Sequence, residues 1–224
     1  MTRSVGTALV LGLALLAAPN LRADTTYTTV GDQNSTVNAF GNNGATNTYG
    51  ETFTAPGGNL QSFTFYTVST GATDVTAQVY AWNGNLYGGN PSQGTGGAAL
   101  FSAPITIANG GGSTVATTVN IGGAGLALTS GDNYIILFTN PDNGNQAFWS
   151  IDTSNPSPSA LGGFNFNNGA AGAAVYDDFA NFGTLEYTAV FASAAATPEP
   201  SSLMLLGTGL LGAGAMLRRR LLGR

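Results

Sequence analysis

The stretch that decides the fold is Leu126–Thr139, LALTSGDNYIILFT. Its second half, NYIILFT from Asn133, carries apolar side chains at both odd and even positions, so both faces of a strand formed there would be apolar. This pattern is typical of a central strand that is covered on both sides. The preceding Ser130-Gly131 is a turn signal. We therefore expect a buried central strand over 133–139 that is entered from a tight turn.

Further strands are predicted on either side of this stretch. The segment 74–82, DVTAQVYAW, alternates apolar and larger polar or aromatic side chains, as a half-buried strand does. Other short runs rich in Thr, Val, Phe, Tyr and Ile lie between Gly- and Asn-rich turns, at 49–55, 60–69, 100–107, 114–121, 146–152 and 184–193. No segment between them has a helical period. The pattern predicts an all-β domain over 24–192, an antiparallel β-sandwich of jelly-roll or Greek-key type.

One motif in the central stretch supports a sandwich. Leu128, Gly131 and Tyr134 stand as L-x-x-G-x-x-Y at the entry to the predicted strand. The motif resembles the tyrosine corner of immunoglobulin-like and fibronectin-type sandwiches, which implies that Leu128 fills the core and that the Tyr134 hydroxyl bonds back to the turn. This is a structural role, not a binding site.

Charge is distributed very unevenly along the 224 residues. The six arginines lie only at the two ends, and the 174 residues from Asp24 to Thr197 contain no Lys, Arg or His but ten carboxylates. A domain without cations cannot neutralise phosphates, so nucleic-acid binding is excluded. It cannot form internal salt bridges either, so its stability must come from hydrogen bonds and from burial of apolar groups, including its 22 aromatic side chains.

The absence of two residue types narrows the chemistry. The chain has no cysteine, which excludes thiol catalysis and cysteine-ligated metal. It has no histidine, which removes a Ser-His-Asp triad and the usual zinc ligands. Glycoside hydrolysis needs only two carboxylates, but nothing in the sequence marks a pair among the ten. We therefore expect a protein that is not an enzyme, with a hydrolase as the less favoured alternative.

The first 23 residues have the layout of a secretory signal peptide. Arg3 is followed by an apolar stretch over 5–18 and by small residues near Ala23. We predict translocation by the Sec pathway and cleavage between Ala23 and Asp24. The alternatives are cleavage after Ala18 and an uncleaved anchor helix, for which the apolar stretch is short.

The C-terminus combines three elements in a fixed order. An Ala/Ser linker over 193–197 leads to Pro198-Glu199-Pro200, which the two prolines hold extended and accessible to a protease. The uncharged run 201–217 follows and predicts a transmembrane helix at the short end of spanning length. The cluster Arg218, Arg219 and Arg220 then predicts a cytoplasmic end.

Together these elements resemble the PEP-CTERM sorting signal of Gram-negative bacteria. The resemblance covers about residues 197–220, within a predicted sorting segment over 198–224. It implies recognition by an exosortase, cleavage near Pro198, Glu199 and Pro200, transient residence in the inner membrane, and delivery to the outer cell surface or extracellular matrix. Proteins with this signal are associated with exopolysaccharide and biofilm. The alternative is an ordinary tail anchor with a Pro-rich stalk.

Two kinds of ligand site are candidates in the exported domain. Exposed aromatic rings stack on sugars, so Tyr80, Trp82, Tyr87 and Trp149, which lie beside predicted loops, are candidate glycan contacts; the alternative is that they belong to the core or its rim. Oxygen ligands gather at 142–145 (DNGN) and 176–178 (YDD), which suggests calcium, although neither matches an EF-hand loop and Asx residues are common in turns. No other cofactor is expected.

These observations predict an exported, surface- or exopolysaccharide-associated protein that is not an enzyme and is processed at its C-terminal motif. The alternative from another class is a carbohydrate-binding module with the same destination. The sequence does not identify a ligand.

Overall fold

The computed structural model describes residues 24–31, 35–37, 46–84, 93–140, 147–152, 162–167, 175–178, 184–193 and 200–222, with only the backbone described at 35, 93, 147–152, 167, 175–178 and 200–205. Residues 23–194 form one compact unit, the β-domain, and the C-terminal helix belongs to another.

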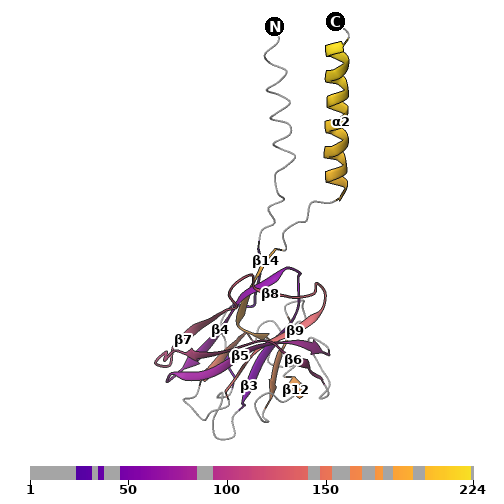
Figure 1. Cartoon of the computed structure of the whole chain (residues 1–224). Helices are drawn as coiled ribbons and strands as arrows, with labels where there is room; N and C mark the ends of the chain where they lie inside the picture. Colours follow the sequence, from indigo (N-terminus) through magenta and orange to yellow (C-terminus); the bar gives the residue numbers. More distant parts are fainter. Residues whose placement is uncertain are drawn as a thin grey trace. The chain divides into compact units, whose positions relative to one another are not determined.

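The β-domain is built from strands joined by turns (Figure 1). The strands are β1 (Thr25–Thr28), β2 (Ser35–Thr36), β3 (Thr48–Thr54), β4 (Asn59–Ser69), β5 (Thr73–Asn83), β6 (Gln93–Ile107), β7 (Thr114–Asn120), β8 (Leu126–Ala127), β9 (Asn133–Thr139), β10 (Ala147–Asp152), β11 (Phe164–Asn167), β12 (Val175–Asp178), β13 (Thr184–Leu185) and β14 (Tyr187–Ala192). All of their pairings are antiparallel. The all-β, antiparallel prediction is therefore confirmed.

The first sheet has eight strands and is organised around β4. One edge of β4 pairs with β14 and then, further along, with β10, while the other edge pairs with β7 and β8. β14 pairs in turn with β1, and β10 pairs with β2 and β13. The first and last strands of the β-domain are thus neighbours, with Thr25 opposite Phe191.

The second sheet closes on itself. Its six strands pair in the order β11-β12-β6-β5-β9-β3, and β3 pairs back to β11. The four-residue strand β12 completes the ring. Its last two residues pair with β11, and its first two residues pair with the start of β6. An antiparallel β-sandwich of jelly-roll or Greek-key type was predicted, and the closed ring departs from that prediction. Closure satisfies the edge hydrogen-bonding groups that an open sheet would leave free.

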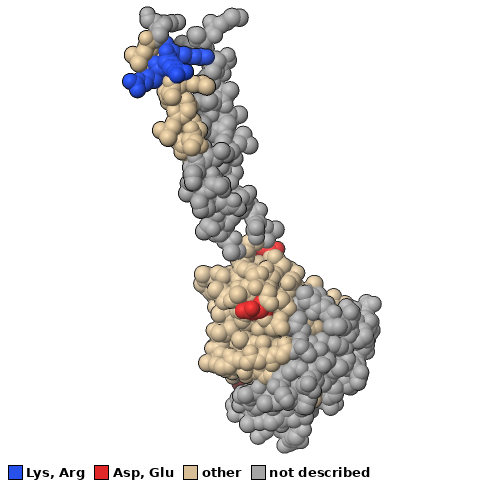
Figure 2. Space-filling model, turned by 90° about the vertical axis from the view of Figure 1, so that its right-hand side faces the viewer, with Lys and Arg blue, Asp and Glu red and all other residues tan. Residues whose placement is uncertain are grey.

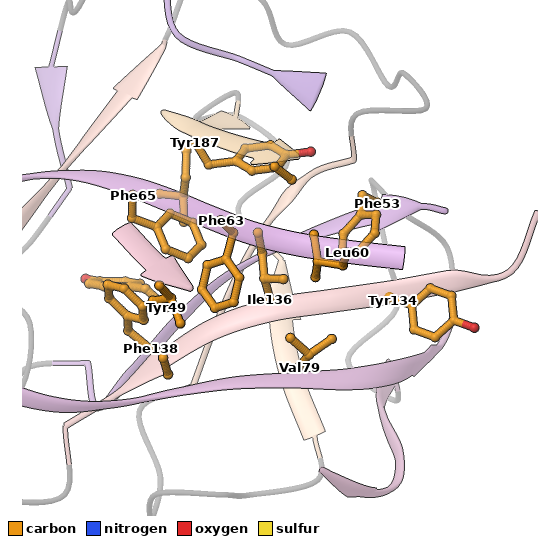
Figure 3. Close-up of a cluster of buried hydrophobic side chains, with 14 of the residues drawn as sticks. Tyr49, Phe53, Leu60, Phe63, Phe65, Val79, Tyr134, Ile136, Phe138 and Tyr187 are labelled. Carbon is orange, nitrogen blue, oxygen red and sulfur yellow. The ribbon is translucent and has the colours of Figure 1, made fainter. Parts of the chain in front are cut away.

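The main core lies between the ring and the eight-stranded sheet. Phe63 and Phe65 of β4 point toward Phe138 of β9, and the Phe65 and Phe138 ring centroids are 4.9 Å apart (Figure 3). Val75, Ala77 and Val79 of β5 belong to the same buried cluster, which confirms the alternation predicted for this strand. Fully buried aromatic side chains stabilise a fold by roughly 2–3 kcal/mol each through the hydrophobic effect alone.

Both faces of β9 are buried, as the sequence predicts. Ile136 and Phe138 belong to the main core, whereas Ile135 and Leu137 alternate with them and form a second cluster with Trp82. Close packing on this second face explains Gly50, which pairs with Leu137 across β3 and β9. A Cβ at Gly50 would lie 2.8 Å from the Ile136 carbonyl oxygen and 2.9 Å from the Leu137 Cβ, so only glycine fits.

The tyrosine corner forms as predicted at the entry to β9. The Thr129 backbone N–H donates to the Tyr134 hydroxyl oxygen over 2.9 Å, and Leu128 is buried in the main core. Gly131 adopts a φ of 86°, a conformation that favours glycine. Its N–H donates to the Ala55 carbonyl, which ties the turn to the end of β3.

A carboxylate lies in the main core beside a tyrosine. Glu51 lies between Tyr49 and Phe53 on the same face of β3, is fully buried, and accepts a hydrogen bond from the Leu185 N–H over 3.0 Å. Burial raises the pKa of Tyr187 well above its ordinary value, and electrostatic repulsion from Glu51, and from Tyr27 once that side chain is ionised, raises it further. Burial also raises the pKa of Tyr49.

The C-terminal unit contains the helix α2 (Pro200–Leu222). It begins at the second proline of Pro-Glu-Pro, a residue that is favoured in the first turn of a helix, and it continues through the predicted stop at Arg218–Arg220. A helix over 201–217 is therefore confirmed and longer than predicted. Its membrane-spanning character is not, because no helix within the described residues is both long and apolar enough to cross a membrane. Glycines at 207, 209, 212 and 214 dilute its apolar surface.

Changing Tyr134 to Phe tests the tyrosine corner. The substitution removes the acceptor of the Thr129 N–H, and we expect the free energy of unfolding, measured with urea, to fall by about 1–2 kcal/mol. Tyr66→Phe is the control, because Tyr66 is a half-buried residue on the solvent face of β4 and should change stability by less than about 0.5 kcal/mol. Equal effects of the two changes would contradict the role of the corner.

Alkaline pH should unfold the β-domain through its tyrosines. Tyr187 has a higher pKa folded than unfolded, so its contribution to stability is complete below the unfolded value of about 10 and is lost as pH rises above it. No lysine or cysteine titrates between Asp24 and Thr197, which leaves tyrosine as the side chain that responds. We expect urea midpoints to fall steadily above about pH 10.

Two variants test whether the loss of stability at alkaline pH comes from Tyr187 in the core. Glu51→Gln removes the charge that raises the Tyr187 pKa but keeps an oxygen for the Leu185 N–H, so the alkaline loss should be smaller. Asp74→Asn, at an exposed position on β5, should leave the loss unchanged. A urea midpoint that stays constant to about pH 11.5 would show that the buried tyrosines do not couple to folding.

Candidate functional site

A hollow of about 350 Å³ opens at the end of β5 beside the tyrosine corner. The residues that line it are Ala81, Trp82, Asn83, Gly131, Asp132, Asn133 and Tyr134. They come from two segments, the last residues of β5 and the turn that leads into β9. The pairing of β5 with β9, with Ala81 opposite Tyr134, brings the segments together.

The polar groups of the hollow differ in how firmly they are held. The Asn133 amide is used by the fold, since its oxygen accepts from the Thr54 hydroxyl over 3.0 Å and its nitrogen donates to the Gly84 carbonyl over 3.4 Å. Asn83 and Asp132 are exposed. An amide, a carboxylate and an aromatic wall together suit a small neutral ligand that offers hydroxyl groups, such as a sugar.

The predicted aromatic contacts Tyr80 and Trp82 lie on the same side of β5. Trp82 is only 5% exposed and belongs to the second cluster, with Ile135 and Leu137, so it contributes a wall of the hollow and not an open stacking platform. Tyr80 is half-buried against that cluster, and its hydroxyl accepts from the Gln78 side-chain amide over 3.1 Å. Both aromatics therefore pack in or against the second cluster, and their predicted role as glycan contacts stays a prediction.

Several predicted site residues are not placed by the structure. Tyr87 and the segment 142–145 lie outside the described residues, and Trp149 and the segment 176–178 are described only in their backbones, within β10 and β12. Within the part of the chain that is described, no three acidic side chains come together as metal ligands do. The calcium and Trp149 predictions remain untested.

No sequence pattern marked Asn83, Asp132 and Asn133 as site residues. Asn83-Gly84 and Gly131-Asp132 are signals for turns, and Asx residues are common in turns for backbone reasons. Only the pairing of β5 with β9 shows that these two turns share one hollow. The Asx residues at these positions were visible in the sequence, but their role in turns already explained them.

The two ends of the β-domain lie together. β1 begins at Thr25, and β14 ends at Ala192, so that the Ser193 N–H donates to the Asp24 carboxylate over 3.4 Å. The predicted cleavage residue Ala23 and the motif residues Pro198 and Glu199 lie outside the described residues. Neither predicted cut falls within a described strand.

The two units carry charged side chains of opposite sign (Figure 2). The described surface of the β-domain in this view carries only a few carboxylates, whereas α2 carries the arginine cluster. Arg219 and Arg220 lie in the last turn of α2, where a cation interacts favourably with the helix dipole.

Comparison with known proteins identifies the C-terminal segment. No curated protein and no solved structure matches the chain. A family model described as the PEP-CTERM protein-sorting motif matches residues 196–220, which confirms the resemblance noted in the sequence. The chain therefore carries a PEP-CTERM protein-sorting motif over residues 196–220, which supports an exported protein that an exosortase sorts.

Proposed function

We propose that the chain is the precursor of an extracellular protein whose acidic β-domain is delivered by two cleavages. The Sec translocon exports it, signal peptidase cleaves between Ala23 and Asp24, and an exosortase cleaves near Pro198–Pro200. The mature β-domain then stays on the outer surface or in the extracellular matrix of a Gram-negative cell, associated with exopolysaccharide in the biofilm, without acting as an enzyme.

The observation that carries this proposal is the PEP-CTERM motif at residues 196–220. The limits of the fold agree with it, because the described strands run from Thr25 to Ala192 and lie between the two predicted cuts. All six arginines lie outside the segment that would remain, so processing would leave a domain with carboxylates and no basic side chain.

The intact mass of the protein recovered from the cell surface tests this proposal. We expect an N-terminus at Asp24 and a C-terminus near Pro198. Because trypsin has no site between Asp24 and Thr197, peptide mapping needs another protease such as pepsin. A surface form that retains Arg224 would contradict exosortase processing.

A matched pair of variants assigns the cleavage to the motif. Replacing Pro198, Glu199 and Pro200 by alanine should leave Arg224 in place. Asp74→Ala is the control, because it changes an exposed residue of β5 outside the matched residues 196–220, and its processing should be normal. Normal processing of the motif variant would contradict the assignment.

A carbohydrate-binding role at the hollow is the second candidate. Its support is the combination of the Trp82 wall with the exposed Asn83 and Asp132. Trp82→Ala is a poor probe, because removing a buried tryptophan costs about 3–5 kcal/mol of stability. Asn83→Ala combined with Asp132→Ala leaves the core intact, and it should abolish retention on a glycan array. The control Asp74→Ala removes an exposed carboxylate elsewhere on β5 and should bind normally.

A further inference from the structure

A row of four threonines crosses the solvent face of the eight-stranded sheet. Thr28 of β1 lies opposite Thr188 of β14, Thr188 lies opposite Thr64 of β4, and Thr64 lies opposite Thr118 of β7. The hydroxyl oxygens of Thr28 and Thr188 are 3.1 Å apart, and those of Thr64 and Thr118 are 2.9 Å apart. Four adjacent strands therefore present threonine at one level.

The exposed residues at the neighbouring levels of this face are also uncharged. The threonine face, as we define it, is the four-threonine row, the level Thr26, Val190, Ser62 and Asn120 on one side, and the pair Tyr66 and Ala116 on the other. By strand alternation, two carboxylates flank the row. Glu186 is two residues from Thr188 and lies beside Tyr66, but its side chain is buried, whereas Asp24 lies one level beyond Thr26 at the corner of the sheet. The exposed part of the threonine face thus carries no charged side chain, although the domain has ten carboxylates.

The face is turned to solvent. Thr28 and Thr118 are exposed, and Thr64 and Thr188, which have neighbours on both sides, are half-buried. The alternating residues Phe63 and Phe65 point the other way and are fully buried in the main core. The hydrophobic core therefore requires β4 in this register, but it does not require threonine on the outer face.

The geometry of the row suits an extended chain of sugars. Neighbouring strands lie about 4.8 Å apart, so four of them span about 14 Å, and their spacing is close to the length of one sugar residue in an extended glycan. Each threonine offers a hydroxyl that donates and accepts together with a methyl group, and a sugar ring offers the same two kinds of surface. The Tyr66 ring adds an aromatic group beside the row.

The negative charge of the β-domain favours an uncharged polysaccharide over an acidic one. Anionic polysaccharides are repelled by a domain that has carboxylates and no basic side chain, and a second copy of the domain is repelled for the same reason. A flexible uncharged chain meets no such repulsion, and it can follow the twist of the sheet.

We propose that the threonine face binds an uncharged polysaccharide, with the chain lying across β1, β14, β4 and β7. This site is separate from the hollow at Trp82. The inference rests on the proposed extracellular role and specifies the partner that the β-domain meets there.

The test uses the protein that producing cells release, after its intact mass has established the processing separately. The probes are exopolysaccharide from those cells, separated by anion exchange into uncharged and acidic fractions, with cellulose and alginate as uncharged and acidic references. Binding is measured by co-sedimentation or affinity electrophoresis at physiological salt. We expect retention by the uncharged fraction and not by the acidic one.

Three variants locate the contact. Thr28→Glu with Thr118→Glu places a carboxylate at each exposed end of the row, and we expect about tenfold weaker binding. Ala98→Glu with Ser102→Glu adds the same charge at exposed positions of β6, in the other sheet, and should bind as the wild type does. Thr64→Val with Thr188→Val removes two hydroxyls, keeps strand-favouring side chains, and should also weaken binding. Urea midpoints establish that each variant is folded.

The outcomes separate the inference from the proposed function. Weaker binding by both threonine variants, with the β6 variant unchanged, supports the inference. Equal binding by all variants, preference for the acidic fraction, or loss only in the Asn83/Asp132 variant overturns it. A correctly processed protein that binds no uncharged polysaccharide overturns the inference alone, whereas an unprocessed surface form contradicts the proposed function.

Discussion

The burial of β9 on both faces is the constraint on which the structure depends. Its even residues contact the eight-stranded sheet, and Ile135 and Leu137 need a second apolar layer on the opposite side. An open sandwich would leave that second face in water, at a cost of roughly 25 cal/mol for each Å² of apolar surface. Closing the ring through β12 accompanies the burial of that face, and Gly50 permits the close approach of β3.

The lack of cations shapes the rest of the domain. Without Lys, Arg or His between Asp24 and Thr197, no carboxylate there has a basic side chain of the β-domain as its partner. Glu51 instead accepts a backbone hydrogen bond inside the core, and threonine pairs such as Thr48 with Thr139, 3.2 Å apart, connect neighbouring strands. Hydrogen bonds and aromatic packing thus replace ion pairs, and salt screens them less than it screens exposed ion pairs.

Local pattern predicted the strands but not their closure. The alternation in 74–82, the two apolar faces of 133–139 and the tyrosine corner at Tyr134 are local signals, and each is confirmed. The ring depends on Val175–Asp178, whose four residues carry no strand pattern of their own and pair with distant segments. Glu51 was missed because a carboxylate ordinarily indicates a solvent-facing position, although Tyr49 and Phe53 on the same face indicated the core.

The candidate sites, like the closed ring, depend on long-range strand pairing that local sequence patterns do not predict. Aromatic composition led to Trp82 but could not show that its ring is buried, and the hollow beside it depends on two turns that only strand pairing brings together. The threonine row was invisible for a similar reason, because its members lie in four segments whose register is set by the core on the opposite face of the sheet. The sorting motif was recognised because it is contiguous in sequence.

Hydrogen exchange on the processed protein tests the central role of β9 most directly. Pepsin peptides read by mass spectrometry report the protection of each strand, since trypsin cannot cut the domain. If the two buried faces of β9 hold the fold together, amides of Ile135–Phe138 should exchange only by global unfolding, and more slowly than those of β1 and β7 at the edges of the sheet. Exchange of β9 as fast as that of β1 would contradict this account.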